Sequence, residues 1–199
     1  FVKEPSRPGL VPMMCAGVVS GLSGLLSFFW DDPLVVPPDP GRLAQEAIKS
    51  MRLRAIDIGA FPKTLEADPG AYGLVGWNMW LWNASEGVDR WGPVSATATA
   101  GAYSVTATAR VVKLEWDMGN GDKVTCAKTT PRKGDRLRNE KSPTCGYVYG
   151  ERGVYDISAT TYWRVDWSGV GAKGLTNLEL TRHASVNISE IQVVTTNDP

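Results

Sequence analysis

The sequence predicts a mainly β fold, an antiparallel β-sandwich preceded by an apolar N-terminal segment and a short helix. From Gly73 onward, apolar residues recur at every second position in successive runs, and no helical pattern separates these runs. The chain of 199 residues also holds 8 Trp and 6 Tyr, residue types that suit a pleated, half-buried surface. Strands that follow one another without helices exclude a parallel α/β sheet.

Residues 1–32 are the first predicted region, and an uncharged stretch from Leu10 to Trp30 dominates it. Its length suits a membrane helix, which needs about 20 apolar residues. Basic residues precede it and acidic residues follow it, so membrane contact would leave the rest of the chain outside. Gly17 and Gly21 form G-x-x-x-G, which lets helices approach closely in lipid and favours self-association. Two alternatives stay open: the end of a signal sequence, or an assembly segment buried against a partner.

Residues 33–72 are predicted to form a proline-rich linker and a short amphipathic helix. The prolines hold the linker extended and stiff. Asp39 caps the helix, Pro40 occupies its first turn, and the helix ends near Arg52. The apolar residues at helical spacing are Leu43, Ala47, Ile48 and Met51. A short extended segment then leads to the β-domain.

Residues 73–199 are predicted to form the sandwich. A first strand runs from Gly73 to Trp82, and a long hairpin turns at Gly101 and Ala102 and ends near Trp116. Further strands are expected at 123–127, 153–167, 175–188 and 190–195. Their alternation turns one face of each strand toward a common core.

Composition and motifs exclude several function classes. The 21 basic and 21 acidic residues balance, so no overall field attracts nucleic acid. The one histidine, His183, lies in an alternating run, where a strand surface is a simpler interpretation than a general base. Neither C-x-x-C nor H-E-x-x-H is present. Three carboxylates fall on predicted strands: Asp156, Asp166 and Glu179. Their spacing gives no reason to expect two of them at the separation that a glycosidase needs. We expect no enzyme activity, metal or cofactor.

A tight hairpin is predicted at the run Trp116, Asp117, Met118, Gly119, Asn120 and Gly121. Gly119 and Gly121 permit a positive φ, and Asn120 tolerates one. The Asp117 carboxylate can accept backbone hydrogen bonds that close the turn. Calcium binding by Asp117 and Asp122 is the alternative, and it would need about six oxygen ligands.

This turn and the tyrosines after it resemble the PKD module. The W-D-F-G-D-G turn, the later H-x-Y and the G-x-Y of that module correspond to Trp116 to Gly121, Tyr147 and Tyr149, and Gly153 and Tyr155. Met118, Asn120 and Tyr147 depart from the pattern, so the roles of those side chains do not carry over. The resemblance implies a PKD-like, immunoglobulin-like sandwich.

The stretch from Leu53 to Val194 is similar to secreted, Streptomyces-type actinobacterial proteins. The motifs that carry this similarity are Leu74 to Trp82, Trp91 to Pro93, Ser104 to Ala109, Trp116 to Gly121, and Cys145 to Tyr149. Such proteins often carry a loose ATP/GTP-binding label. We reject nucleotide binding, because G-x-x-x-x-G-K-[ST] is absent and a P-loop needs a strand-to-helix turn.

Cys126 and Cys145 flank a polar loop and are predicted to form a disulfide. Closing such a loop would restrict the unfolded chain by about 3 kcal/mol in the entropy model, and a bridge implies an oxidising compartment. Free buried thiols are the alternative. The loop is basic, and contact with an anionic wall polymer or an acidic protein face competes with simple solvation. Its candidate contact residues are Arg132, Lys133, Arg136 and Arg138.

These features predict a non-enzymatic extracytoplasmic protein, secreted or at the cell surface, that serves as a binding or display module. Anchoring in the membrane through Leu10 to Trp30 stays an open alternative. The alternative is a structural subunit of a filament or membrane-associated assembly, packed through the segment from Leu10 to Trp30. Protein partners or self-association are expected, and nucleic acid and nucleotide are not.

Overall fold

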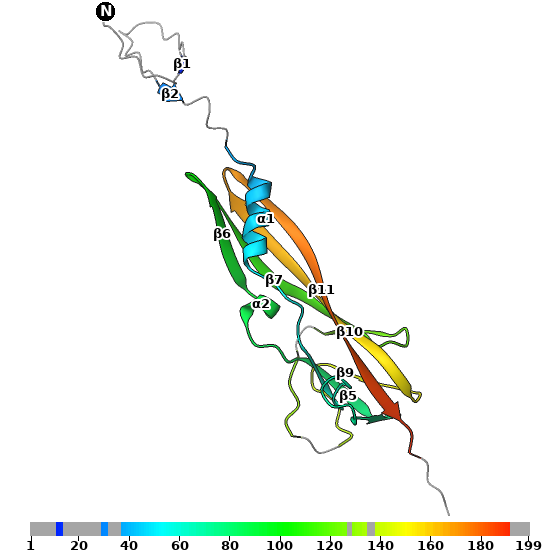
Figure 1. Ribbon diagram of the computed structural model, residues 1–199. Helices are drawn as coiled ribbons and strands as arrows, with labels where there is room; N and C mark the ends of the chain where they lie inside the picture. The colour runs from blue at the N-terminus through cyan, green and yellow to red at the C-terminus, as the bar shows by residue number, and fades with distance from the viewer. Residues whose placement is uncertain (1–10, 14–28, 32–36, 127–128, 135–137, 192–199) are drawn as a thin grey trace, which may run out of the picture. The chain divides into compact units, whose positions relative to one another are not determined.

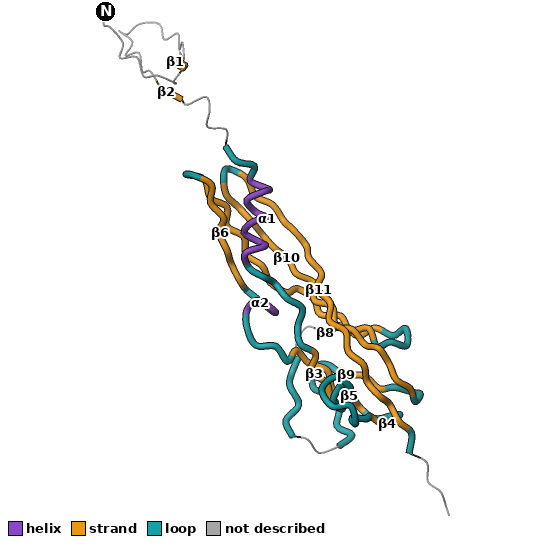
Figure 2. The backbone as a smooth tube through the Cα atoms, in the orientation of Figure 1, coloured by secondary structure: helices purple, strands orange, loops and turns teal. Residues whose placement is uncertain are grey.

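The structure is a computed structural model that describes residues 11–13, 29–31, 37–126, 129–134 and 138–191. The chain divides into two compact units, Phe1–Asp39 and Pro40–Pro199. Strands make up far more of the described chain than helices do, as the orange and purple segments of Figure 2 show. The predicted mainly β class is confirmed.

The described residues of the first unit include a short strand pair. β1 (Val11–Met13) pairs antiparallel with β2 (Phe29–Asp31). The described residues of the stretch predicted as a membrane helix, 11–13 and 29–30, therefore lie in strands and not in a helix. Gly17 and Gly21 lie outside the described residues. Among the residues that the structure describes, no helix is both long and apolar enough to cross a membrane.

The predicted amphipathic helix is present as α1 (Pro40–Ser50). Leu43, Ala44 and Ala47 form its buried face, as expected for apolar residues three and four positions apart. The chain leaves the helix at Arg52, which has a positive φ of 51°. Because α1 packs against the sheet, the helix part of region 33–72 belongs to the second unit.

A large twisted sheet forms most of the second unit (Figure 1). Its path is β4-β11-β10-β7-β6, and β8 also pairs with β7. All contacts are antiparallel except the one between β4 and β11. The strands are β4 (Gly73–Leu74), β6 (Val94–Ala100), β7 (Tyr103–Asp117), β8 (Lys123–Cys126), β10 (Gly153–Gly169) and β11 (Ala172–Ser189).

A second, three-stranded sheet has the order β3-β5-β9. β3 is Ile58–Phe61, β5 is Asn78–Asn83 and β9 is Gly146–Val148. Both contacts are antiparallel. A four-residue helix, α2 (Val88–Trp91), leads from this sheet into β6.

Two strand predictions need correction. The first predicted strand is divided into β4 and β5, because Gly76 adopts a φ of 76° and Trp77 N donates to Leu74 O in a turn. The strand predicted from Glu190 does not begin there: β11 continues to Ser189, and Glu190 and Ile191 belong to no strand. The rest of that prediction lies outside the described residues.

β7 contains a β-bulge that separates two cores. Its register with β10 passes from Tyr162↔Lys113 to Trp163↔Val111, so Val112 is an extra, exposed residue. A bulge changes which residues of a strand face a given side. The buried residues are accordingly Val105, Ala107 and Ala109 before the bulge, and Leu114 and Trp116 after it.

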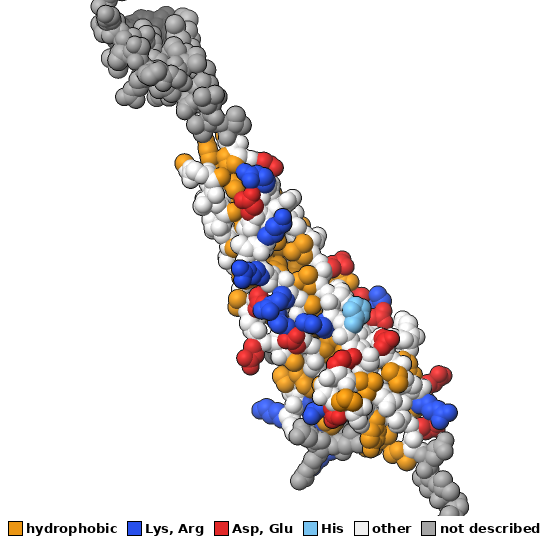
Figure 3. Space-filling view, viewed as in Figure 1, with side chains coloured by type: hydrophobic (Ala, Val, Ile, Leu, Met, Phe, Trp, Pro, Cys, Tyr) orange, Lys and Arg blue, Asp and Glu red, His pale blue; other side chains and the backbone are white. Residues whose placement is uncertain are grey.

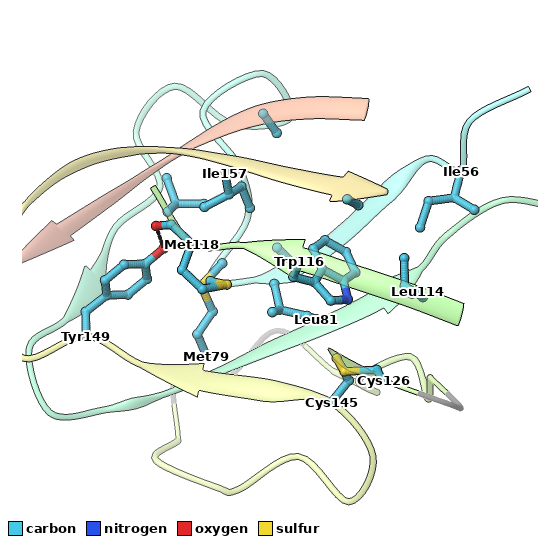
Figure 4. Packing of buried hydrophobic residues seen from close by; sticks show 14 of the residues in the cluster. Ile56, Met79, Leu81, Leu114, Trp116, Met118, Cys126, Cys145, Tyr149 and Ile157 are labelled. Atoms are coloured by element: carbon cyan, nitrogen blue, oxygen red, sulfur yellow. Dashed lines mark hydrogen bonds between the residues drawn. A yellow bond between two sulfur atoms is a disulfide. The ribbon is translucent and has the colours of Figure 1, made fainter. Parts of the chain in front are cut away.

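We call the core before the bulge the helix-covered end and the core after it the disulfide end. At the helix-covered end, Ala47 and Met51 of α1 pack against Ala107, Ala109, Trp163 and Val165. At the disulfide end, the small sheet covers the continuation of the same strands (Figure 4). Residues in this second core include Met79, Leu81, Leu114, Trp116, Met118, Tyr149 and Ile157.

Candidate functional site

The predicted turn lies between β7 and β8 and is closed by its own polar side chains. Asp117 Oδ1 accepts a hydrogen bond from Gly119 N at 3.0 Å, and Asn120 Oδ1 accepts one from Asp122 N at 3.1 Å. Met118 N donates to Asp122 O at 2.9 Å. Gly119 and Gly121 have φ values of 74° and 97°, which glycine adopts without steric cost. The segment therefore acts structurally in the turn.

Gly119 also allows a close approach between the turn and β10. A Cβ atom at this position would lie 2.6 Å from Asp156 O, whereas a Cβ at Gly121 would meet nothing within 4 Å. The two glycines therefore have different roles: Gly121 serves the turn alone, and Gly119 also serves packing against the neighbouring strand.

Tyr147 ties the turn to β9. Its hydroxyl accepts from Asn120 Nδ2 at 2.8 Å and donates to the Asp122 carboxylate. Burial, followed by this hydrogen bond to Asp122, raises the pKa of Tyr147 above its ordinary value. Sequence reasoning left the role of Tyr147 open because it departs from the PKD pattern, and its position in the H-x-Y motif was the available signal.

The Asp122 and Asp117 carboxylates are thus engaged within the protein. Within the described part of the chain, no group of three His, Cys, Asp or Glu residues is arranged to hold a metal ion.

Tyr149 joins the turn to the core. It is buried, and its hydroxyl donates to Met118 O at 2.9 Å, the dashed contact in Figure 4. Its ring stacks on Tyr155 at 4.3 Å and meets Tyr147 edge-on at 4.8 Å between ring centroids. Burial raises the pKa of Tyr149 well above its usual range. The three tyrosines thus connect the turn, β9 and β10.

The predicted disulfide is present between Cys126 and Cys145, with a Cα–Cα distance of 5.8 Å. Both cysteines are buried beside Trp116, as Figure 4 shows. Cys126 ends β8 of the large sheet, and Cys145 directly precedes β9 of the small sheet. The bridge therefore links the two sheets and closes the chain between them, which we call the disulfide loop (residues 127–144).

The disulfide loop rests on aromatic side chains. The guanidinium carbon of Arg132 lies 3.6 Å from the ring centroid of Phe61 and 5.9 Å from that of Trp80. Such stacking combines cation–π attraction with packing of a planar cation. Trp80 Nε1 also donates to Glu140 O at 2.5 Å. Two parts of the loop, at Arg132 and at Glu140, therefore contact Trp80.

A second polar contact holds the same arm of the loop, next to Glu140. Asn139 Oδ1 accepts from Asn78 N at 2.8 Å and from Asn78 Nδ2 at 2.7 Å. Next to it, the exposed Arg138 pairs with Glu140 at 3.5 Å, a surface contact worth little by itself. Lys133 and Lys141 are also exposed. Arg136 lies outside the described residues.

An open depression of about 300 Å³ lies beside Phe61. Its lining mixes aromatic, charged and small residues, including Lys63, Asp68 and Tyr72.

We define the loop surface as the described residues of the disulfide loop together with Phe61 and Trp80. Its exposed cations are Lys133, Arg138 and Lys141.

Of the three strand carboxylates noted in the sequence, Asp156 and Asp166 lie ten residues apart on β10, and Glu179 lies on β11. Asp156 Oδ1 accepts from Ser185 Oγ at 2.9 Å. Asp166 is bound by Arg164 and Arg110, and the hydrogen bond from Arg164 is the main reason that the pKa of this carboxyl is lowered. His183 lies on β11 and its side chain is exposed, which agrees with the predicted position on a strand surface. In the face shown in Figure 3, acidic and basic side chains are interspersed.

Comparison with protein-family models, with curated proteins and with solved structures finds no match for this chain.

Proposed function

We propose that this chain is a non-enzymatic extracytoplasmic binding or display module, secreted or held at the cell surface, whose loop surface contacts an anionic partner. The observation that carries the proposal is the disulfide that fixes a basic loop on an aromatic support. A covalently closed, packed loop keeps its exposed charges in a fixed arrangement, which reduces the ordering cost of binding.

The disulfide supports the extracytoplasmic part of the proposal. Cys126 and Cys145 are both buried and lie between two sheets, so their bridge is part of the folded core. Structural disulfides persist in oxidising compartments and are rare where thiols are kept reduced. Closing this loop contributes about 3 kcal/mol in the entropy model, which is a large fraction of the stability of an ordinary domain.

The charge distribution supports the anionic partner. The whole chain is neutral, so attraction has to arise from a local patch. Lys133, Arg138 and Lys141 are exposed on the loop surface, and only Arg138 has a described acidic partner, Glu140. An acidic protein face or an anionic wall polymer would supply the complementary charge.

We also propose that the mainly β fold is a PKD-like sandwich, and that the chain is related to secreted actinobacterial proteins. Two antiparallel layers around Trp116 support it, since β3-β5-β9 faces β7 and β10 across the core at the disulfide end. The W-D-M-G-N-G turn and Tyr149 join these layers through the bond to Met118 O.

A structural subunit of a filament or membrane-associated assembly is the second candidate. The uncharged composition of the stretch from Leu10 to Trp30 favours it, because an apolar surface of that size calls for a covering partner.

Compartment and binding are tested separately. Intact cells of the source organism are treated with an external protease and a thiol label. We expect the protein to be cleaved from outside, with Cys126 and Cys145 unlabelled until reduction. Reduced protein protected inside the cytosol would overturn the proposed location.

For binding, K133Q/R138Q/K141Q is compared with K49Q/R52Q/R152Q, which removes as many exposed cations from other surfaces. We expect the loop variant to lose salt-sensitive retention on purified cell envelopes and the control to keep it. Equal retention by both variants would reject the loop surface as the binding site.

A further inference from the structure

β11 has an edge opposite β10 that is free over much of its length. β10 and β11 form a hairpin with a two-residue turn, closed by the pair Gly169↔Ala172. In such a hairpin the closing pair exchanges hydrogen bonds, and the bonded pairs then recur every second residue. Even-numbered residues of β11 therefore bond to β10. The odd-numbered ones direct N–H and C=O toward the opposite edge.

Hydrogen bonds at the C-terminal end of β11 agree with this assignment. Ser185 O accepts from Leu65 N at 2.8 Å, and Ser185 N donates to Glu66 Oε1 at 2.8 Å. Ser189 O accepts from Val75 N at 3.0 Å. Both odd-numbered residues thus bond away from β10, and this part of the edge is covered.

The covered part ends at Arg182, whose guanidinium bonds to Ile56 O at 3.3 Å and to Asp57 at 3.2 Å. From Lys173 to Thr181, no described residue bonds to the backbone groups on this edge. Helix α1 packs against β6, β7 and β10, and β11 is the outer strand of the sheet in this part (Figure 1). An exposed strand edge of this length is a template for pairing with another strand.

We propose that this edge pairs antiparallel with the same edge of a second copy of the chain, about a two-fold axis at Thr176. The open stretch is bounded by the turn at Val170 and Gly171 and by the covered region from Arg182. A self-pairing strand is centred on the middle of the stretch available to it, because both ends meet the same limits. The residues between those limits are 172–181, so their middle falls between Thr176 and Asn177.

Charge selects the register centred on Thr176. With Thr176 opposite itself, Lys173 of one copy lies opposite Glu179 of the other, and symmetry produces this pair twice. Directly opposed unlike charges stabilise antiparallel strands. Moving the register by one step in either direction would place Lys173 opposite Asn177 or Thr181 and lose both pairs. Length therefore limits the centre to Thr176 or Asn177, and charge selects Thr176.

The other edge of the sheet lacks these features. The residues of β6 that direct backbone groups outward are Ser95, Thr97 and Thr99, by the same argument from its two-residue turn. The strand is shorter and carries no charge that would set a register. It serves as the matched control surface. The pairing of β11 does not depend on the loop surface or on the proposed compartment.

Crosslinking tests the register directly in the full chain. A C15S background leaves Cys126 and Cys145 in their bridge, so that an introduced cysteine is the free thiol. Directly opposed residues of a non-hydrogen-bonded pair have Cα atoms about 4.5 Å apart, within disulfide range. We expect T176C to form a covalent dimer on mild oxidation. T181C on the same strand would lie many residues from its counterpart and should not.

A charge exchange tests the same contact without a crosslink. By sedimentation of the C15S chain, we expect K173E and E179K each to weaken dimerisation about tenfold. The double variant K173E/E179K should restore it. N177P should also abolish pairing, since it removes an outward N–H and spares the bonds to β10, whereas T97P on β6 should not. A T176C chain that does not crosslink, or a double variant as weak as the single ones, would overturn the proposal.

Discussion

The helix-covered end and the disulfide end are built on the same strands but by different means. At the helix-covered end, a continuous helix packs on small side chains such as Ala107 and Ala109. At the disulfide end, the cover is made of short strands, and large side chains such as Trp116 and Tyr149 fill the core. The bulge at Val112 marks the change. The difference shows that short strands can cover a core when large aromatic side chains and a disulfide join them to the main sheet.

Removing Trp116 should have the largest effect. Trp116→Ala is expected to cost about 3–5 kcal/mol in the free energy of unfolding, because it empties the middle of the disulfide end. Trp163→Ala is the matched change at the helix-covered end. Hydrogen exchange should show early opening of β5 and β9 in the first variant and of α1 in the second. Identical exchange patterns would contradict the division into two ends.

Trp116→Phe should cost much less than Trp116→Ala. Trp116 Nε1 is buried and has no hydrogen-bond partner among the described residues. Phenylalanine removes that unpaired donor while keeping most of the apolar ring, so the loss of volume is partly offset.

Removing the disulfide should have the next largest effect. The double variant C126A/C145A is expected to lose about 3 kcal/mol of stability, measured by urea denaturation. Because the bridge joins β8 to the chain before β9, faster hydrogen exchange should concentrate in β9 and the disulfide loop. A loss spread equally over α1 would show that the bridge stabilises the whole unit rather than one end.

Substituting each glycine of the turn distinguishes the cost of an unfavourable backbone conformation from the cost of a packing clash. Gly121→Ala should cost about 1 kcal/mol, since it only forces a Cβ into a left-handed conformation. Gly119→Ala should cost more than about 2 kcal/mol, because its Cβ would also meet Asp156 O. Thermal or urea denaturation of both variants checks the order. Equal losses would remove the packing role of Gly119.

The smallest effect concerns the Tyr149 hydroxyl and is sensitive to pH. Tyr149→Phe should cost about 1 kcal/mol near neutral pH by removing the bond to Met118 O. Since the pKa of Tyr149 is raised in the folded state above its ordinary value of 10.0, the unfolded state loses its proton first. The contribution of Tyr149 to stability is therefore fully present below pH 10 and is lost as the pH rises above it.

The Tyr149→Phe variant should lose less stability above pH 10 than the native protein does. Tyr155→Phe is the control, since it removes only an exposed bond to Glu151 O. An unchanged alkaline decline in Tyr149→Phe would show that other groups cause it.

The long strands were predictable because one face of each is exposed. In β7 and β10, buried and polar residues alternate over many positions, and the glycine turns between strands stand out in the sequence. The helix α1 was equally clear from Pro40 and the spacing of Leu43 and Ala47. These features depend on neighbouring residues alone.

The small sheet was harder to predict because contacts far apart in sequence create it. β9 has three residues and no alternation, and Cys145 and Tyr149 hold it in place. The turn at Gly76 lies inside a run that alternates as a strand would. At the candidate site, the cysteines and the Asp117 turn followed from local patterns. The stacking of Arg132 on Phe61 did not, since those residues are joined only by the fold.

The central claim is that the disulfide end exists in an oxidised form where the protein works. The most direct test is the intact mass of the protein isolated from its source after alkylation without reduction. We predict one alkylated thiol at most, at Cys15, and a mass lower by two hydrogen atoms for the Cys126–Cys145 bridge. Alkylation of Cys126 and Cys145 in the native protein would contradict the account.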